Sequence, residues 1–140
     1  MIAGALLLVG TTFSTQKLAE PPPVLVEKSE WKTINASTPP EIRMFYAIEK
    51  YAEYYGIPKK YAYGIAYAET SYEDPFHENY NHKQVSYAGA VGPMQIMPST
   101  ANYVSGKKIS QKDLLYNIDL NVQISMKLLS KLHKQYKDWS

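Results

Sequence analysis

Residues 59–98 constrain the fold more than any other stretch, because an amphipathic helix there runs into a long loop that ends in a glycine-bracketed turn. One face of the helix carries Ala62, Ile65 and Ala66 at the 3.6-residue period, and Glu69 falls on the same stripe. A carboxylate facing a core loses water and must be hydrogen-bonded, paired or protonated. The alternative is a helix that ends at Glu69 with its carboxylate in water. The pattern makes Glu69 a candidate proton donor.

The loop after this helix is long and ends in residues 89–98, Gly-Ala-Val-Gly-Pro-Met-Gln-Ile-Met-Pro. Loops longer than roughly 12–15 residues inside a compact domain are usually functional or disordered. This loop carries aromatic residues that disordered segments tend to lack, namely Tyr72, Phe76, Tyr80 and Tyr87. Gly89 and Gly92 allow close approach of the backbone to a ligand, or an unusual φ. We expect the loop to form one wall of a cleft.

Composition narrows the class of protein. A chain of 140 residues is the size of one domain and can bury a core of its own. It contains no cysteine, which excludes a disulfide framework and a thiolate metal site. A formal net charge of +2, with no dense basic run, does not indicate a nucleic-acid partner. The 13 tyrosines supply rigid amphipathic rings that suit the faces of sugars.

The N-terminal part is expected to lie outside the folded domain. Residues 1–19 begin with the apolar run MIAGALLLVG, which has the length of a signal-peptide core and is too short for a membrane span. We interpret it as a signal peptide or the remnant of an N-terminal anchor, and therefore expect export to the periplasm or cell envelope. A disordered or partly buried N-terminus is the alternative. Residues 20–37 predict an extended proline-rich linker, with Trp31 as the residue that docks it onto the domain.

Residues 38–140 are predicted to form a mainly helical domain. The segment Thr38-Pro39-Pro40-Glu41 has the form of a capping box, with Pro39 at the first helical position, and Gly56 is expected to end that helix. Further helices are predicted to start at Pro98, after Ser110 and near Asn117. The last of them is expected to run to Tyr136 and to turn six residues inward: Ile118, Val122, Ser125, Leu129, Leu132 and Tyr136.

Residues 69–72, Glu-Thr-Ser-Tyr, and residues 89–101, Gly-Ala-Val-Gly-Pro-Met-Gln-Ile-Met-Pro-Ser-Thr-Ala, form a recognisable pair of motifs. Together they resemble the signature of the soluble lytic transglycosylases, bacterial and phage enzymes with a lysozyme-like fold that cut peptidoglycan. The sequence departs from the family pattern at Thr70, where serine is preferred, and at Pro93, where leucine is preferred. Residues 77–84 look like an insertion. The resemblance implies a mainly α, lysozyme-like α (α+β) domain with a long active-site loop.

The resemblance also implies a reaction. Glu69 would be the sole acid/base in cleavage of the β-1,4 bond between N-acetylmuramic acid and N-acetylglucosamine, giving 1,6-anhydromuramyl products without a cofactor. The residues implied to bind substrate are Thr70, Ser71, Tyr87, Gly92, Met94 and Gln95. Without the resemblance, Met94 is interpreted as a core residue, Gln95 as a loop-to-backbone hydrogen-bond donor and Tyr87 as a loop anchor.

Other functions stay open at this point. A muramidase or chitinase-like hydrolase of the same fold would use water, with Glu73 or Asp74 as a second carboxylate. A non-catalytic glycan-binding module is the other alternative. The spacing of His77, Glu78 and His82 misses the His-Glu-x-x-His metal pattern by one residue and lies in a loop, so we predict no metal site.

The family normally continues beyond the position of Ser140 into a helix with a Tyr-Asn-x-Gly motif. The resemblance therefore implies a domain that is C-terminally incomplete and correspondingly less stable or prone to weak association. The implied partners are peptidoglycan glycan strands and an envelope, phage or secretion assembly, with the chain itself a monomer or weakly associated.

Overall fold

The structure, a computed structural model, describes residue 34 and residues 37–137. The predictions made for residues 1–19, for most of the linker at 20–37 and for Trp31 lie outside the described residues. The described part contains the following helices: α3 (Pro40–Tyr55), α4 (Lys59–Thr70), α5 (Pro98–Ser105), α6 (Gln111–Tyr116) and α7 (Ile118–Tyr136). The prediction of a mainly helical fold is confirmed. No described helix has both the length and the apolar character needed to span a membrane.

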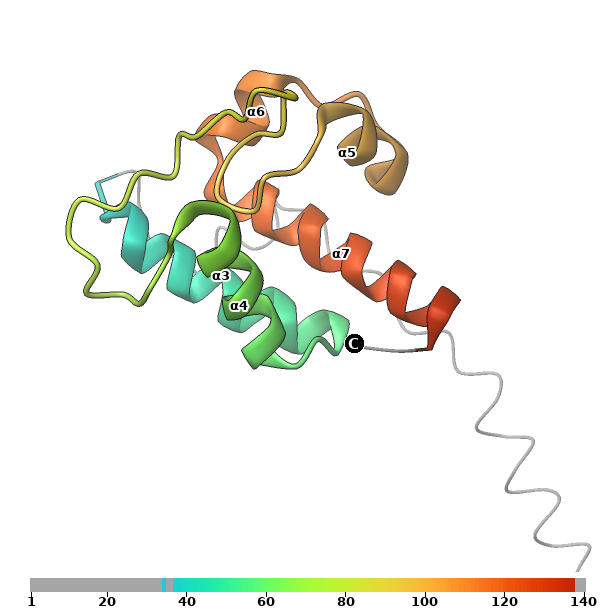
Figure 1. The fold of residues 1–140 in the computed structure, drawn as a ribbon, viewed down its shortest axis with the longest axis horizontal. Coiled ribbons are helices and arrows are strands. Elements are labelled where there is room, and N and C mark those ends of the chain that lie inside the picture. Colours follow the sequence, from blue (N-terminus) through green and yellow to red (C-terminus); the bar gives the residue numbers. More distant parts are fainter. Residues whose placement is uncertain (1–33, 35–36, 138–140) are drawn as a thin grey trace, which may run out of the picture.

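Two apolar clusters hold the helices together, and α7 contributes to both of them (Figure 1). The first cluster joins α7 to α3 and α4 through residues that include Met44, Ile48, Tyr51, Ala62, Ala66, Val122 and Met126. The second joins α7 to α5, α6 and the loop through Val91, Ile96, Ala101, Val104, Leu114 and Ile124. Burial of large apolar side chains is the main favourable term in folding. Because α7 belongs to both clusters, it fixes the loop relative to the α3–α4 pair.

Most predicted helix ends are confirmed by their caps. Gly56 ends α3 in the left-handed conformation, with φ of 67°, which glycine adopts without steric cost. Ser110 and Asp113 form a capping box at the start of α6. Asn117 caps α7, since its side chain accepts a hydrogen bond from the backbone N–H of Leu120.

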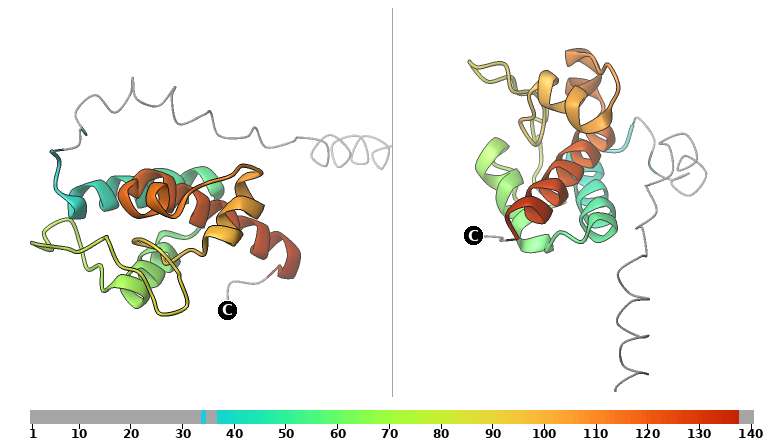
Figure 2. Two further views of the ribbon diagram at one scale, coloured as in Figure 1. Left: turned by 90° about the horizontal axis from the view of Figure 1, so that it is seen from above. Right: turned by 90° about the vertical axis from the view of Figure 1, so that its right-hand side faces the viewer.

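The start of the first predicted helix and the buried face of the last one differ from the prediction. The first helix begins at Pro40, and its N-cap, Pro39, makes no side-chain capping bond, so the expected capping box of residues 38–41 does not form. On α7, Leu132 is 40% exposed and Tyr136 is 68% exposed, although both were predicted to face inward. Figures 1 and 2 show that the last turns of α7 project beyond α3 and α4, so the periodic pattern continues where no helix of the described part covers it.

The long connection between α4 and α5 has two parts with different structure. The outer loop, residues 73–83, extends to the first turn of α3 (Figures 1 and 2). The inner turn, residues 89–97, folds back on itself through an isolated antiparallel bridge between Val91 and Ile96, and a second bridge joins Val91 to Val85 before the turn. The connection is therefore a structured wall beside the end of α4.

Candidate active site

The end of α4 places an acid at the surface and its neighbour in the core. Glu69 is exposed, whereas Thr70 is only 4% exposed. The buried positions on this helix are Ala62, Ala66 and Thr70, so the inward stripe follows the i, i+4, i+8 series and Glu69 lies on its flank. The expectation that Glu69 lies on the buried stripe is wrong. Within residues 34 and 37–137, the Glu69 carboxylate has no hydrogen bond or ion pair and is open to a ligand.

Thr70 is a support for the inner turn. Its hydroxyl oxygen lies 2.9 Å from the carbonyl oxygen of Pro93 and 2.7 Å from the hydroxyl of Tyr80. Since Pro93 offers only an acceptor, Thr70 donates to it and accepts from Tyr80. Burial raises the pKa of Tyr80 to about 12, so this hydroxyl keeps the proton it donates. Thr70 was predicted to contact substrate, but its hydroxyl is hydrogen-bonded inside the protein.

A second set of hydrogen bonds ties the inner turn to Gln84, which precedes it in the sequence. The backbone N–H of Gly92 donates to the carbonyl oxygen of Gln84 at 2.8 Å. The side-chain amide of Gln95 donates to the carbonyl oxygens of Gln84 at 3.0 Å and Gly92 at 2.9 Å. The Gln84 side chain in turn donates to the carbonyl oxygen of Thr70 at 3.3 Å. Gln95 therefore holds the turn in shape, and Gln84 ties the turn to the helix end that carries Glu69.

Asn121 of α7 holds the opposite side of the inner turn. This side chain is fully buried, and its amide nitrogen donates to the carbonyl oxygens of Val91 at 2.9 Å and Leu114 at 3.1 Å. Its carbonyl oxygen accepts from the backbone N–H of Met94 at 3.1 Å. Both amide hydrogens and the amide oxygen are thus used, which is what a buried amide requires. Asn121 connects the turn to α6 and α7 at once.

Gly92 is required by the closeness of this contact. Its φ is +77°, and a Cβ atom there would lie 2.4 Å from the amide nitrogen of Asn121 and 2.7 Å from the carbonyl oxygen of Leu114. Both the backbone conformation and the space exclude a larger side chain. Gly92 therefore shapes the turn by allowing α6 and α7 to approach its backbone.

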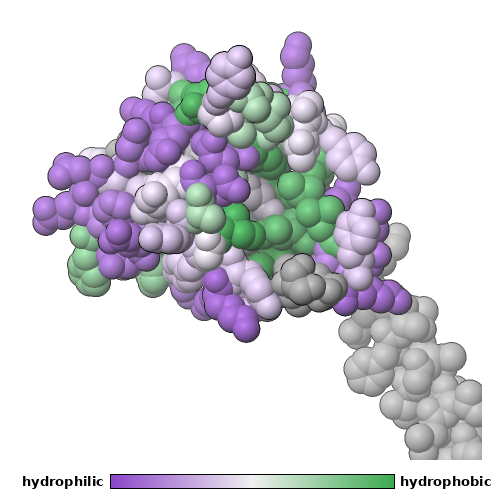
Figure 3. Space-filling model, in the orientation of Figure 1, coloured by the Kyte–Doolittle hydropathy of each residue, from purple (hydrophilic) through white to green (hydrophobic). Residues whose placement is uncertain are grey.

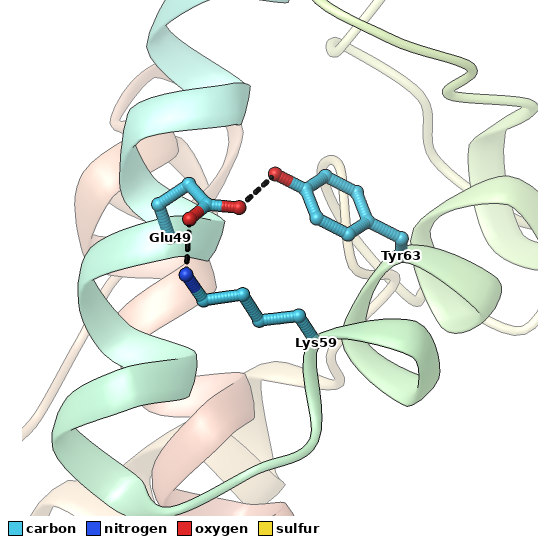
Figure 4. Close-up of polar contacts among 3 residues, drawn as sticks. All are labelled: Glu49, Lys59 and Tyr63. Carbon is cyan, nitrogen blue, oxygen red and sulfur yellow. Dashed lines mark hydrogen bonds and ion pairs between the residues drawn. The ribbon is translucent and has the colours of Figure 1, made fainter.

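An ion pair and a tyrosine fix α4 on α3 (Figure 4). Glu49 of α3 accepts a hydrogen bond from the hydroxyl of Tyr63 at 2.8 Å and pairs with the ammonium of Lys59 at the start of α4. The Lys59 hydrogen bond lowers the pKa of the Glu49 carboxyl. Burial, together with this hydrogen bond to Glu49, raises the pKa of Tyr63. The contact ties the first two turns of α4 to α3.

Aromatic rings continue this support from α3 to the outer loop. The ring centroids of Phe45 and Tyr63 are 6.5 Å apart, and those of Tyr63 and Tyr72 are 6.4 Å apart. Tyr72 meets Tyr80 edge to face at 5.0 Å. Such offset and edge arrangements are the favourable geometries for aromatic pairs. This row of packed rings holds Tyr80 in the position where its hydroxyl bonds to the hydroxyl of Thr70.

The other predicted site residues divide into buried and exposed groups. Met94 is 5% exposed and belongs to the apolar core. Ser71 is exposed in a left-handed conformation, with φ of 57°. Tyr87 is fully exposed, next to the inner turn, so it does not anchor the loop. The structure therefore brings Glu69, Ser71 and Tyr87 to the surface and keeps the residues of the turn beneath it.

Sequence reasoning did not find Asn121, Gln84 or Tyr80 as parts of this site. A signal was present for Asn121, since it lies between Ile118 and Val122 on the face of α7 that was predicted to be buried. A polar residue at a core position needs partners there. Nothing in the sequence indicated that those partners are the backbone groups of the inner turn.

Apolar side chains are exposed on one face of the molecule. Figure 3 shows apolar side chains gathered in a depression over α7, between α5 and α4. Clefts with apolar walls and a few polar groups are the usual form of a ligand site. Within residues 34 and 37–137, no group of three or more histidine, aspartate or glutamate side chains is arranged to hold a metal ion. The polar group that the candidate site offers is the exposed carboxylate of Glu69 at the end of α4.

A protein-family model described as the transglycosylase SLT domain matches residues 46–140. The chain belongs to this family. Membership of the SLT family implies cleavage of peptidoglycan glycan strands of the lytic transglycosylase type, with peptidoglycan as the substrate. The match spans α4, the inner turn and α7, which are the elements that form the candidate site. A comparison with curated proteins found no match.

Proposed function

We propose that this protein is a lytic transglycosylase that cleaves the β-1,4 bond between N-acetylmuramic acid and N-acetylglucosamine, with Glu69 as its acid and base. The observation that carries the proposal is the placement of an open carboxylate beside a fixed turn. Glu69 is exposed, and the next residue, Thr70, is hydrogen-bonded to the inner turn through Pro93 at 2.9 Å. A reacting group held next to a rigid wall favours a productive approach of the sugar.

In the proposed reaction, the Glu69 carboxyl first donates its proton to the oxygen that bridges the two sugars. The bond between that oxygen and the muramyl C1 breaks, and the N-acetyl group of the substrate helps to stabilise the positive centre at C1. The Glu69 carboxylate then removes the proton from the muramyl C6 hydroxyl, whose oxygen attacks C1 and closes the 1,6-anhydro ring. The nucleophile is part of the substrate, so its effective concentration is high without a positioned water molecule.

The surrounding residues have different roles in this proposal. Ser71 offers an exposed hydroxyl two residues after Glu69, and the exposed ring of Tyr87 offers a face for a sugar. Thr70, Gly92, Met94 and Gln95 keep the wall in place from below, because they are buried or hydrogen-bonded within the protein. Substrate contacts at these positions would come from the backbone.

The test is the mass of the products. Purified peptidoglycan is digested with the full chain, and the released muropeptides are analysed by mass spectrometry. We expect muropeptides with anhydro ends, each lighter by one water than the hydrolytic product. Reducing ends would instead show that water is the nucleophile, and would assign the chain to the hydrolases, with Glu73 or Asp74 as the second carboxylate to examine.

We also propose that the protein acts outside the cytoplasm, in the periplasm or cell envelope. The support for this is the apolar run at residues 1–10 and the location of peptidoglycan itself. Fractionation of cells that express the full chain tests it, and recovery of all of the protein in the cytoplasmic fraction would contradict it.

A further inference from the structure

A cavity of about 450 Å³ lies between the outer loop and the start of α3. Its lining residues are Pro39, Pro40, Glu41, Asn79, Tyr80, Asn81, His82 and Lys83. This volume is within the range of ligand pockets in proteins. The outer loop contains residues 77–83, most of the segment that looks like an insertion in the sequence, and this segment lies between the two signature motifs at residues 69–72 and 89–101.

The cavity contains a buried polar group whose hydrogen-bonding capacity is unused. His82 lines the cavity and is 5% exposed, and its ring makes no hydrogen bond to any other side chain or backbone group of residues 34 and 37–137. Close by, the Nε atom of Arg43 is buried and also lacks a partner within the described part of the chain. Buried polar groups in native proteins are nearly always satisfied. The Arg43 Nε atom is such an exception, and the nearly buried His82 ring beside it has no internal partner either, so a ligand in the cavity would supply the missing partners.

The charges around the cavity favour an anionic group with polar neighbours. Burial, reinforced by Arg43 and Lys83, lowers the pKa of His82 to about 4, so at neutral pH its ring offers one donor and one acceptor. The positive end of the α3 dipole also points here, since Pro39 and Pro40 at the start of that helix line the cavity. Lys83 also lines the cavity, and its ammonium lies 4.9 Å from the centre of the Tyr116 ring.

The lining also contains a carboxylate and two amides. Glu41 would repel a bare dianion such as phosphate, but it can pair with an amino group. Asn79 and Asn81 carry side-chain amides of the kind that bind peptide groups. A chain with peptide bonds, a free carboxylate and an amino group satisfies this set of side chains better than a simple inorganic anion does.

We propose that this cavity binds the short, carboxylate-bearing peptide that is attached to the glycan strands of peptidoglycan. The peptide as the source of the ligand rests on the proposed function. The cavity and the acid are linked through one residue, because Tyr80 lines the cavity and its hydroxyl is hydrogen-bonded to Thr70, the neighbour of Glu69. A peptide seated here would hold its sugar near the end of α4, and peptide-bearing strands would be the preferred substrate.

The first experiment measures binding of the free tripeptide L-alanyl-γ-D-glutamyl-diaminopimelate to the full chain by calorimetry, with inorganic phosphate as the second ligand. We expect the tripeptide to bind and phosphate to bind at least tenfold more weakly. Asn79→Gly removes one amide at a position where φ is 63°, which glycine adopts readily. We expect this variant to bind the tripeptide about 3- to 10-fold more weakly, as the loss of one or two neutral hydrogen bonds implies.

Lys137→Gly is the matched control, because Lys137 is also exposed and left-handed, with φ of 54°, but lies at the far end of α7. We expect it to bind the tripeptide as the unchanged chain does. His82→Gln, which keeps a donor and an acceptor in a different geometry, is the second variant, and we expect weaker binding with unchanged cleavage of peptide-free strands. Equal binding of tripeptide and phosphate, no measurable tripeptide binding, or equal losses in Asn79→Gly and Lys137→Gly would each overturn the proposal.

The second experiment compares the KM for glycan strands with and without their peptides. We expect a lower KM for the peptide-bearing strands, and we expect Asn79→Gly to reduce that difference while kcat stays the same. Equal KM values would contradict the peptide site while leaving the proposed reaction intact. A chain that binds the tripeptide but releases anhydro products from neither substrate would contradict the proposed reaction and leave the peptide site standing.

Discussion

The inner turn and the outer loop belong to the same connection between α4 and α5, yet they satisfy their polar groups in opposite ways. In the inner turn, buried backbone groups are paired with Asn121 on one side and Thr70 on the other, at 2.9–3.1 Å. In the outer loop, the Nδ1 atom of His77 is buried without a partner among the described residues, and the ring of His82 is 5% exposed without a hydrogen bond to them.

The inner turn is therefore a fixed wall, and the outer loop is a surface that can bind a ligand. A turn whose hydrogen bonds are all made internally has one stable arrangement, and it can position a substrate against an acid without moving. A loop with unsatisfied buried groups is less stable alone, and a ligand that completes the bonds stabilises it. We therefore expect substitutions in the inner turn to act mainly on stability and rate, and substitutions in the outer loop to act mainly on binding.

The largest effect is expected from Gly92→Ala. The new Cβ would lie 2.4 Å from the amide of Asn121, in a backbone with φ of +77°, so the turn must move. We expect a loss of about 3 kcal/mol or more in the free energy of unfolding, measured with urea. Gly106→Ala is the control, because Gly106 has φ of +67° but a Cβ atom there would meet no other atom within 4 Å. It should lose about 1 kcal/mol from backbone strain alone. Equal losses of unfolding free energy in Gly92→Ala and Gly106→Ala would show that the contact between residue 92 and Asn121 is not tight.

The contribution of the outer loop to the free energy of unfolding should depend on pH. The pKa of His82 is about 4 in the folded chain and 6.5 for the free side chain, so between these values the unfolded chain binds the additional proton. The stabilisation is complete above pH 6.5 and is lost as the pH falls towards 4. We expect this one group to account for roughly 3 kcal/mol of the loss in unfolding free energy over that range. His82→Gln should flatten the pH dependence by this amount, and parallel curves for both chains would contradict the assignment.

Thr70→Val should have an intermediate effect. Valine fills the same space but leaves the carbonyl of Pro93 and the hydroxyl of Tyr80 without their buried partner. We expect a loss of about 2 kcal/mol in the free energy of unfolding and a lower kcat, because the inner turn is no longer tied to the end of α4. Thr70→Ser keeps the hydroxyl and should retain most of the rate. A serine variant as impaired as the valine variant would show that the methyl group, and not the hydrogen bonds, is what matters.

Tyr87→Ala should have the smallest effect on stability. Its ring is fully exposed, so we expect the unfolding free energy to change by less than about 0.5 kcal/mol. The KM for glycan strands should nevertheless rise several-fold if the ring lies against a sugar. Tyr136→Ala, which removes another exposed tyrosine at the end of α7, is the matched control and should leave KM unchanged. Equal KM values for both variants would remove Tyr87 from the site.

The sequence predicted the elements of the site better than their orientation. The helix that carries Glu69, the glycine-bracketed turn and the cap of α7 at Asn117 were all accessible from local signals. The buried face of α4 was misjudged by one position, because Ala62, Ile65 and Ala66 fit two neighbouring stripes and only packing distinguishes them. The hydrogen bonds between Asn121 and the inner turn join residues that are 27 and 30 positions apart in the sequence. Helical periodicity does not encode such contacts.

The most direct measurement is the rate at which Glu69→Gln releases anhydromuropeptides from peptidoglycan, compared with the rate for Glu73→Gln. Both residues are exposed acids near the end of α4, so the two substitutions remove the same charge. We expect Glu69→Gln to lower the rate by about 10²- to 10⁴-fold, since the positioned acid and base is lost, and Glu73→Gln to keep most of it. A Glu69→Gln chain that still releases anhydro products at the original rate would show that the open acid at the end of α4 does not carry out the reaction.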